Sequence, residues 1–354
     1  MKSGTTRPLL GGKVNFPLTL APMVGLSHVV LRQLIRAYLP TGAVTFWPTE
    51  MLNSRKIPHE KLGHTPETLR GHGESELVPQ ILGNDESSIQ RSVEKLVDWG
   101  AEAIDINMGC PVTKALRHNY GVALMGDPSY AAEVVRLTVR HSPIPVSVKL
   151  RAIERQTSSQ HLIDFVRPLF EEGASWVTLH PRTAAQKRRG WADWSQIREL
   201  REGVSGPVVG NGDIQTCEDV LAMMRETSCD AVMAGRALAA RPWMMWQLGE
   251  RLGWPPPPGV RGFAPQTPEE EGREYGVNLQ RFLDCAGKFF LPFGEDLVLR
   301  KFRFYLRTTA VWLPFGQTLV SISTRGKSVA EIREGLREFF SAPVEMSPRT
   351  ELRQ

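Results

Sequence analysis

Cys110 is the residue of this chain whose surroundings most favour chemistry. It lies in the segment Asp105–Pro111, which reads Asp-Ile-Asn-Met-Gly-Cys-Pro and continues an apolar run that predicts a buried strand. The Gly-Cys-Pro turn places a thiol at the end of this strand, where it could be a nucleophile, an acid or a packing residue. Asn107, in the same segment, could bind a ligand or a backbone group.

Further polar side chains lie within or at the ends of other apolar runs. A buried ammonium at Lys149 needs an anionic partner, either a flavin edge that becomes anionic on reduction or the carboxylate of Asp105. His180 ends the next run, and Arg182 follows two residues later, so both side chains face one side and favour a ligand. Gln80 could equally bind a heterocycle edge or a backbone group.

Two glycine turns follow the last two predicted strands. Gly210–Asp213 reads Gly-Asn-Gly-Asp, and the second turn is Gly235-Arg236. Glycines let backbone amides approach a phosphate, and Arg236 could hold the same phosphate through two hydrogen bonds. Either turn alone could be an ordinary surface turn, but the two together favour a phosphate site.

Short apolar strands alternate with amphipathic helices from residue 18 to about residue 252. We expect strands at Leu18–Met23, Ala43–Thr49, Leu77–Leu82, Ala103–Asn107, Pro145–Leu150, Trp176–His180, Pro207–Gly210 and Ala231–Ala234. Between and after them we expect helices at 27–38, 85–99, 128–141, 159–172, 194–202, 216–226 and 243–252, with 52–76 mostly a loop.

This alternation predicts an α/β fold, a (β/α)₈ TIM barrel. An open doubly wound sheet would usually carry Gly-x-Gly-x-x-Gly after its first strand, where this chain has Ala-Pro-Met-Val-Gly. In a barrel, the polar clusters share one mouth, and the turns after strands seven and eight often bind phosphate.

Four consecutive prolines, 255–258, separate the barrel from the rest of the chain. Proline cannot continue a helix and favours a stiff extended spacer. We therefore expect a barrel domain at 1–253, a Pro-rich linker at 254–267 and a small C-terminal α-helical domain at 268–354, with a loosely ordered tail from Ser341.

Cations crowd one predicted helix of that second domain, at Arg300, Lys301, Arg303 and Arg307. Positions 300, 303 and 307 fall on one helix face. This face could be an ordinary solvated surface or a surface that follows the phosphates of a nucleic acid.

The composition narrows the class of protein. The chain has 354 residues, 41% of them hydrophobic, and a formal net charge of +5, which permits a nucleic-acid partner without requiring one. Apolar runs are too short to span a membrane, and the N-terminus lacks a signal-peptide core. Four cysteines without Cys-x-x-Cys spacing argue against disulfides and a metal site, so we expect a cytoplasmic protein, with a monomer as the default.

These motifs, in this order over roughly residues 18–245, resemble the dihydrouridine synthases, FMN-dependent enzymes that reduce uridine in RNA, chiefly tRNA, with NADPH. The resemblance is carried by Ala21–Gly25, Gln80–Gly83, Asp105–Pro111, Val148–Arg151, His180–Thr183, Gly190–Trp194, Gly210–Ile214, Gly235-Arg236 and Pro242-Trp243. The helical part matches the family's C-terminal RNA-binding domain by arrangement.

The resemblance implies a role for each matching residue. Reduced FMN would give hydride from N5 to C6 of uracil, and Cys110 would act as the acid that protonates C5, which requires the thiol rather than the thiolate. The isoalloxazine ring would contact Pro22, Met23, Gln80, Lys149 and His180. The ribityl phosphate would be held by Asn211, Gly212, Asp213, Gly235 and Arg236. The uracil would be approached by Asn107 and Arg182, and the RNA by Arg300, Arg303 and Arg307.

Two departures from the family pattern bear on the substrate. Pro181 stands where the family commonly has Gly, and the family's Gly-rich segment after the Cys turn is replaced at residues 116–122. Ribosomal RNA therefore stays open as a substrate beside tRNA. Two different functions also stay open: an FMN barrel reductase acting on a small pyrimidine or enone, and a non-catalytic RNA-binding relative. The joint presence of Cys110, Lys149 and His180 argues against the non-catalytic relative.

Overall fold

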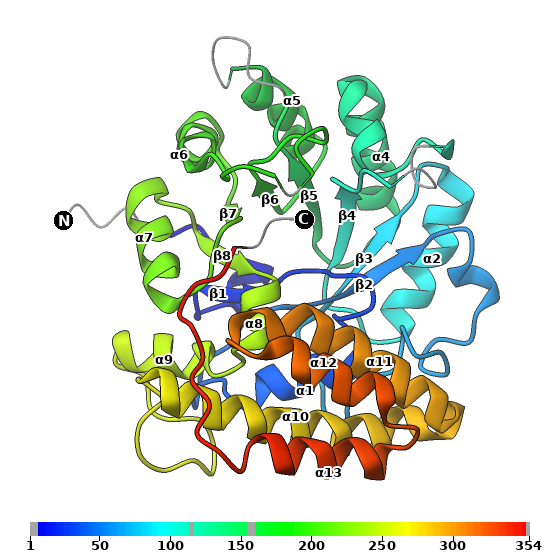
Figure 1. The fold of residues 1–354 in the computed structure, drawn as a ribbon. Helices are drawn as coiled ribbons and strands as arrows, with labels where there is room; N and C mark the ends of the chain where they lie inside the picture. The colour runs from blue at the N-terminus through cyan, green and yellow to red at the C-terminus, as the bar shows by residue number, and fades with distance from the viewer. Residues whose placement is uncertain (1–5, 113–116, 154–159, 188, 352–354) are drawn as a thin grey trace.

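The computed structural model describes residues 6–112, 117–153, 160–187 and 189–351. In this part of the chain, eight parallel strands alternate with helices and form a nearly closed barrel (Figure 1). The strands are β1 Leu18–Leu20, β2 Trp47–Asn53, β3 Leu77–Leu82, β4 Ile104–Met108, β5 Val146–Arg151, β6 Trp176–His180, β7 Val208–Asn211 and β8 Ala231–Ala234. The predicted TIM barrel is confirmed.

The strands pair in the order β1-β8-β7-β6-β5-β4-β3-β2, so the last strand lies beside the first. At the remaining seam, the Thr19 hydroxyl donates to the carbonyl of Phe46, just before β2. All carboxyl ends therefore meet at one mouth, where Asn107 of β4 and Lys149 of β5 lie within two residues of their strand ends and His180 is the last residue of β6.

The barrel helices are α1 Val29–Arg36, α2 Glu86–Asp98, α4 Pro128–His141, α5 Gln160–Glu171, α6 Trp194–Gly203, α7 Cys217–Thr227, α8 Arg236–Ala240 and α9 Met244–Arg251. Side-chain caps fix several starts: Asp85 accepts from the Ser88 amide, and Thr216 forms a capping box with Asp219. The short α8 was not expected, and it follows β8 directly after Gly235.

The second strand begins four residues later than predicted, because residues 43–46 bond to another segment. The carbonyl of Val44 accepts from the amides of Asn15 and Phe16 instead of from a neighbouring strand. The strand then continues through the polar residue Glu50, which is buried and ion-paired. A pattern of apolar residues does not reveal a strand that buries a charge. The loop expected at 52–76 contains one short 3₁₀ helix, Ile57–His59.

The C-terminal helices α10 Pro268–Phe290, α11 Glu295–Thr309, α12 Gly316–Arg325 and α13 Val329–Phe339 pack together below the barrel in Figure 1. A capping box of Thr267 and Glu270 starts α10, with Pro268 at its first position. Among the described residues, no helix is both long enough and apolar enough to cross a membrane.

A buried interface joins the helical domain to the barrel. The Lys301 ammonium of α11 pairs with Glu50 of β2 at 3.2 Å, and the other Glu50 oxygen accepts from the Gly25 amide at 2.6 Å. The His28 ring packs edge-on against Phe290, at 5.1 Å between ring centroids. The helical domain therefore contacts the β1–α1 loop directly.

The Pro-rich linker and the tail both lie against the barrel. Pro256 accepts from the Thr41 amide, so the linker does not hold the two domains apart. The described tail is more ordered than expected: Met346 is fully buried, and Arg349 pairs with Asp219 of α7 at 2.6 Å. A segment that follows the last helix stays fixed when it carries such anchors.

Candidate active site

Asn107 shapes the turn that carries Cys110. Its side-chain oxygen accepts from the amides of Gly109 and Cys110, at 3.1 and 2.9 Å. These bonds satisfy two backbone donors as the chain leaves β4 and fold Cys110 back over the strand end. The residue that we expected to approach a ligand is thus also the scaffold of the thiol.

A chain of hydrogen bonds leads from the barrel interior to this turn. Asn107 Nδ2 donates to Gln80 Oε1 at 2.7 Å, and Gln80 Nε2 donates to Asp105 Oδ2 at 2.6 Å. Ser147 donates to the other Asp105 oxygen at 2.6 Å, and burial raises the pKa of this carboxyl. The chain fixes both amide orientations, since each amide oxygen accepts and each amide nitrogen donates.

Cys110 is nearly enclosed, with 9% of its surface exposed. The aromatic ring of Tyr120 packs beside it, and Gly121 lies so close that a Cβ there would stand 2.6 Å from the Cys110 carbonyl oxygen. Arg151 Nε donates to the Gly109 carbonyl at 2.8 Å from the neighbouring strand. The turn that carries the thiol is therefore held by contacts from three residues.

Lys149 lies beside Asn211 rather than in a salt bridge with Asp105. Its ammonium donates to Asn211 Oδ1 at 3.3 Å, and Asn211 Nδ2 donates to the Met233 carbonyl at 2.7 Å. Burial, and secondly the charge of Arg151, lowers the pKa of Lys149 to about 8. Of the two partners that the sequence left open, Asp105 is taken by Gln80 and Ser147.

His180 is neutral, and its proton position follows from Arg182. Arg182 Nη1 lies 3.2 Å from His180 Nε2, and because arginine only donates, Nε2 is the acceptor and Nδ1 carries the hydrogen. Burial is the largest cause that lowers the pKa of His180 well below its usual value. The positive charges that add to this effect belong to Lys149, Arg151, Arg182 and Arg236.

Asp213 has a structural task in addition to its expected place near a phosphate. Its carboxylate pairs with Arg182 Nη2 at 2.5 Å and accepts from the Ala192 amide at 2.6 Å. Arg182 is only 6% exposed, and Nη2 also donates to the Gly190 carbonyl at 2.6 Å. A carboxylate repels phosphate, so only the backbone of Asp213 suits an anion.

Two glycines keep the backbone open at the ends of β7 and β8. Gly212 has a φ of +116°, and a Cβ there would stand 2.8 Å from that of Ala192. A Cβ at Gly235 would stand 3.2 Å from Met23 Sδ. The two predicted turns and the β1–α1 loop are therefore adjacent, with no side chain at either glycine to fill the space.

The charges at the mouth fit an anionic ligand. Lys149, Arg151, Arg182 and Arg236 all act on His180, whereas the carboxylates of Asp105, Asp213 and Glu50 each have partners within the protein. Asp213 is already paired with Arg182. The surplus of positive charge, the open glycine backbone and the paired amides match a phosphate joined to a heterocycle, so these residues fit the FMN that the resemblance implies.

The three arginines expected on one basic face have different surroundings. Arg300 and Arg307 are exposed on α11. Arg303 is half-buried, and it donates to the Ser323 and Gly326 carbonyls at 2.8 and 2.9 Å, at the end of α12. Lys301 is buried with Glu50. Arg300 and Arg307 can meet a substrate, whereas Arg303 holds α12 to α11.

Several contributors at the site were not predicted from the sequence. Glu50, Lys301 and Tyr120 had no assigned role, and Arg151 entered only as part of a motif. Met51 also takes part, since Asn107 Nδ2 lies 3.1 Å from its sulfur. The sequence signal for these contacts is a charged residue within a strand, such as Glu50. A buried charge requires a partner, so Glu50 indicates that an oppositely charged residue lies beside it.

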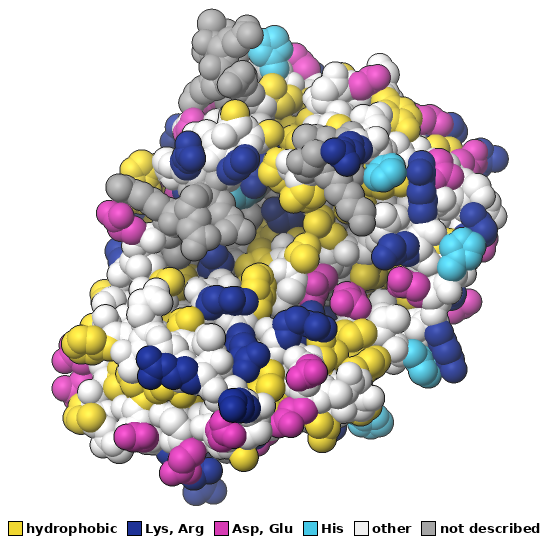
Figure 2. Space-filling model, turned by 45° about the vertical axis from the view of Figure 1, so that its right-hand side comes forward, with side chains coloured by type: hydrophobic (Ala, Val, Ile, Leu, Met, Phe, Trp, Pro, Cys, Tyr) yellow, Lys and Arg dark blue, Asp and Glu magenta, His cyan; other side chains and the backbone are white. Residues whose placement is uncertain are grey.

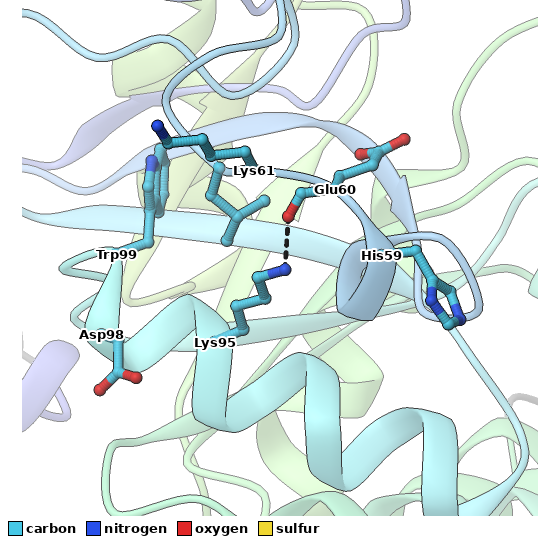
Figure 3. Close-up of a pocket in the computed structure, with 7 residues that line it drawn as sticks. His59, Glu60, Lys61, Lys95, Asp98 and Trp99 are labelled. Carbon is cyan, nitrogen blue, oxygen red and sulfur yellow. Dashed lines mark hydrogen bonds between the residues drawn. The ribbon is translucent and has the colours of Figure 1, made fainter.

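A surface pocket lies away from this mouth (Figure 3). It is shallow, with a volume of about 520 Å³, and its lining consists of His59, Glu60, Lys61, Leu62, Lys95, Asp98 and Trp99. The Lys95 ammonium donates to the Glu60 and Pro58 carbonyls. Asp98 and Trp99 lie at the C-terminal end of α2, which in a barrel faces away from the mouth.

Comparison with known proteins gives a consistent result. Residues 19–257 match the family model described as dihydrouridine synthase. The chain is 35% identical over 226 residues to a probable tRNA-dihydrouridine synthase of Rhizobium leguminosarum, covering 64% of this chain and 69% of that protein. A probable tRNA-dihydrouridine synthase of Mycobacterium tuberculosis is 33% identical over 311 residues, which cover 86% of this chain and 77% of that protein. The tRNA-dihydrouridine synthase B of Pseudomonas aeruginosa is 31% identical over 282 residues, which cover 75% of this chain and 81% of that protein.

Proposed function

This chain belongs to the dihydrouridine synthase family, and we propose that it reduces the C5–C6 double bond of uridine in tRNA to 5,6-dihydrouridine, with FMN as cofactor and NADPH as electron donor. The observation that carries this proposal is the Cys110 thiol, held by Asn107 at the barrel mouth beside a cationic cluster. The relatives are named for tRNA, which favours tRNA over ribosomal RNA.

FMN, when bound, supplies a hydride for the reduction of a conjugated double bond. The residues that would hold its ring are Pro22, Met23, Gln80, Lys149 and His180, and those for its phosphate are Asn211, Gly212, the Asp213 backbone, Gly235 and Arg236. Lys149 contributes positive charge next to Asn211, and His180 offers a donor at Nδ1. Arg182, fixed by Asp213, orients His180 and borders the space for the uracil.

Cys110 is the proton donor in this proposal. The thiol gives its proton to C5 of the uracil, and Asn107, Arg151 and Gly121 keep the thiol in place by contacts with its turn. The near-complete burial of Cys110 keeps bulk water from competing for that proton. A uracil stacked within RNA cannot reach this thiol, so the base must be unstacked first.

We further propose that the helical domain binds the RNA. Its α11 carries the exposed Arg300 and Arg307, and Phe304 of the same helix touches Gly25 in the β1–α1 loop. An RNA held on α11 would therefore lie beside the mouth. Figure 2 shows Lys and Arg side chains gathered below a hollow that is lined by hydrophobic side chains.

A mass-spectrometric assay for dihydrouridine tests the reaction. Purified protein with FMN and NADPH is incubated separately with unmodified tRNA and unmodified ribosomal RNA. We expect dihydrouridine in tRNA alone, and a decrease of about 10²-fold or more with Cys110→Ala, since a positioned acid contributes about 10²–10⁴-fold. Product in ribosomal RNA alone would reassign the substrate. A flavin-loaded protein that oxidises NADPH without forming product in either RNA would indicate a small-molecule reductase.

A further inference from the structure

Trp191 is an exposed aromatic residue at the edge of the active site. It is 82% exposed, although an indole is one of the largest apolar side chains. It lies between β6 and α6, two residues before the Asp193 cap of α6 and next to Gly190, whose carbonyl binds Arg182. The indole is therefore attached to the same backbone that fixes Arg182 and, through it, His180.

The backbone on both sides of Trp191 is fixed. Before it, the Gly190 carbonyl accepts from Arg182 Nη2 at 2.6 Å. After it, the Ala192 amide donates to Asp213 Oδ2 at 2.6 Å, and the Asp193 amide donates to the Pro181 carbonyl at 3.2 Å. Because Arg182 and Asp213 also pair with each other, the segment is held from both ends. The indole is thus presented in a prepared position rather than on a loose loop.

The surroundings of Trp191 indicate the chemistry of its partner. Lys187 and Arg189, close to it in sequence, are exposed cations. Two apolar residues that follow other strands of the barrel are also exposed: Val24 of the β1–α1 loop is 58% exposed, and Val112 after Cys110 is 50% exposed. Apolar side chains interleaved with cations are typical of surfaces that bind unpaired RNA, where bases stack on aromatic rings and phosphates meet cations.

We propose that Trp191 is a stacking platform for an unpaired base next to the target uridine. This inference rests on the proposed function, which requires the uridine to leave the RNA stack. Removal of one base exposes a face of its neighbour, and an indole held at the mouth can cover that face. Trp191 then binds substrate without taking part in hydride or proton transfer.

Binding of unmodified tRNA to the FMN-loaded protein tests this role. We expect Trp191→Ala to raise the Kd by about tenfold, within the range for loss of one base–aromatic stack. Trp191→Phe keeps a flat ring and should recover most of the affinity, whereas Trp191→Leu keeps apolar bulk only and should resemble the Ala variant. Phe263→Ala is the matched control, because Phe263 is 86% exposed in the segment between the two domains.

Dihydrouridine formation by the wild-type protein distinguishes a failure of the stacking role from a failure of the proposed function. If the wild type forms the product and Trp191→Ala binds tRNA as the wild type does, the stacking role is wrong while the function stands. A Leu variant as tight as the Phe variant would also overturn it, since stacking requires a planar ring. Absence of tRNA binding and of product in the wild type would instead contradict the proposed function. Thermal melting of each variant should match the wild type, as the side chain is exposed.

Discussion

At the scale of single residues, the side-chain amides of Asn107 and Gln80 form hydrogen bonds within the protein that hold the turn of Cys110. The side-chain oxygen of Asn107 accepts hydrogen bonds from the backbone amides of Gly109 and Cys110. Its side-chain nitrogen donates to Gln80, and Gln80 in turn donates to Asp105. A polar chain in a low-dielectric interior is rigid when every member is satisfied. We infer that these residues position Cys110, in addition to the ligand contacts that the family resemblance implies.

Lys149 gives a prediction about pH. With a pKa of about 8 in the flavin-free protein, its side chain is charged below pH 8 and neutral above it. In the proposed complex Lys149 donates to the isoalloxazine ring, and a charged donor makes a stronger hydrogen bond than a neutral amine. FMN affinity should therefore be highest below about pH 8 and fall by up to about tenfold per pH unit above it. Equilibrium titration with FMN at a series of pH values measures this.

Two variants serve as comparisons for that titration. Lys149→Met should bind FMN more weakly and show little change across the same range, because the titrating charge is gone. Lys95→Met removes an ammonium from the surface pocket at the C-terminal end of α2 and should keep the wild-type profile. If Lys149→Met retained the wild-type slope, another group would be responsible for it.

At the scale of elements, the turn after β4 depends on the 3₁₀ helix η3, Gly121–Gly126. Gly121 has a φ of +60°, and its close approach to the Cys110 backbone leaves no room for a side chain. The Val122 amide then donates to the Cys110 carbonyl at 3.1 Å. An element that begins 11 residues after Cys110 thus forms one wall of the thiol site.

We expect Gly121→Ala to disrupt catalysis more than stability. The left-handed backbone costs about 1–2 kcal/mol with a side chain, and the added Cβ would displace Cys110. Dihydrouridine formation should fall at least about tenfold, since a shift of about 1 Å can cost about 10²-fold. Gly126→Ala, in the same element but with no neighbour within 4 Å of its Cβ, should behave as the wild type. Equal rates for the two variants would show that Gly121 does not hold the thiol.

At the scale of the whole molecule, the helical domain is part of the mouth rather than an appendage. Lys301 of α11 pairs with Glu50, Glu50 binds the Gly25 amide, and Phe304 packs on Gly25. Breaking a buried pair leaves an uncompensated charge, so this contact fixes the two domains relative to each other. The β1–α1 loop, with Pro22 and Met23, is thereby supported from both domains.

The exposed arginines of α11 predict a salt effect. Replacing Arg300 and Arg307 together with Ala should weaken tRNA binding and reduce the slope of log K against log salt by about 1.5, as each phosphate contact contributes about 0.7–0.9. FMN content should not change. Arg303→Ala should instead lower the melting temperature, because Arg303 holds the Ser323 and Gly326 carbonyls. A double variant with an unchanged salt slope would leave α11 as a solvated face.

The sequence alone located all eight strands, although the second begins four residues later than expected, and it located the turns that follow several of them. Apolar periodicity located Leu77–Leu82, Trp176–His180 and Ala231–Ala234 at their observed bounds, because burial on a sheet is a local property of the pattern. The Gly-Cys-Pro turn and the two glycine turns could likewise be read locally. Together these local patterns predicted the barrel fold, the end of the barrel that carries the site, and the candidate residues there.

Only the tertiary structure decided which of these residues touch. Lys301 meets Glu50 across 251 positions of the chain, and Arg303 differs from its neighbour Arg300 because α12 packs over one and not the other. Asp213 proved to be a partner of Arg182, and Trp191 became visible as a rim residue through its exposure and its fixed backbone. Periodicity reports that a side chain is buried, but its partner depends on how distant segments pack, which no local pattern contains.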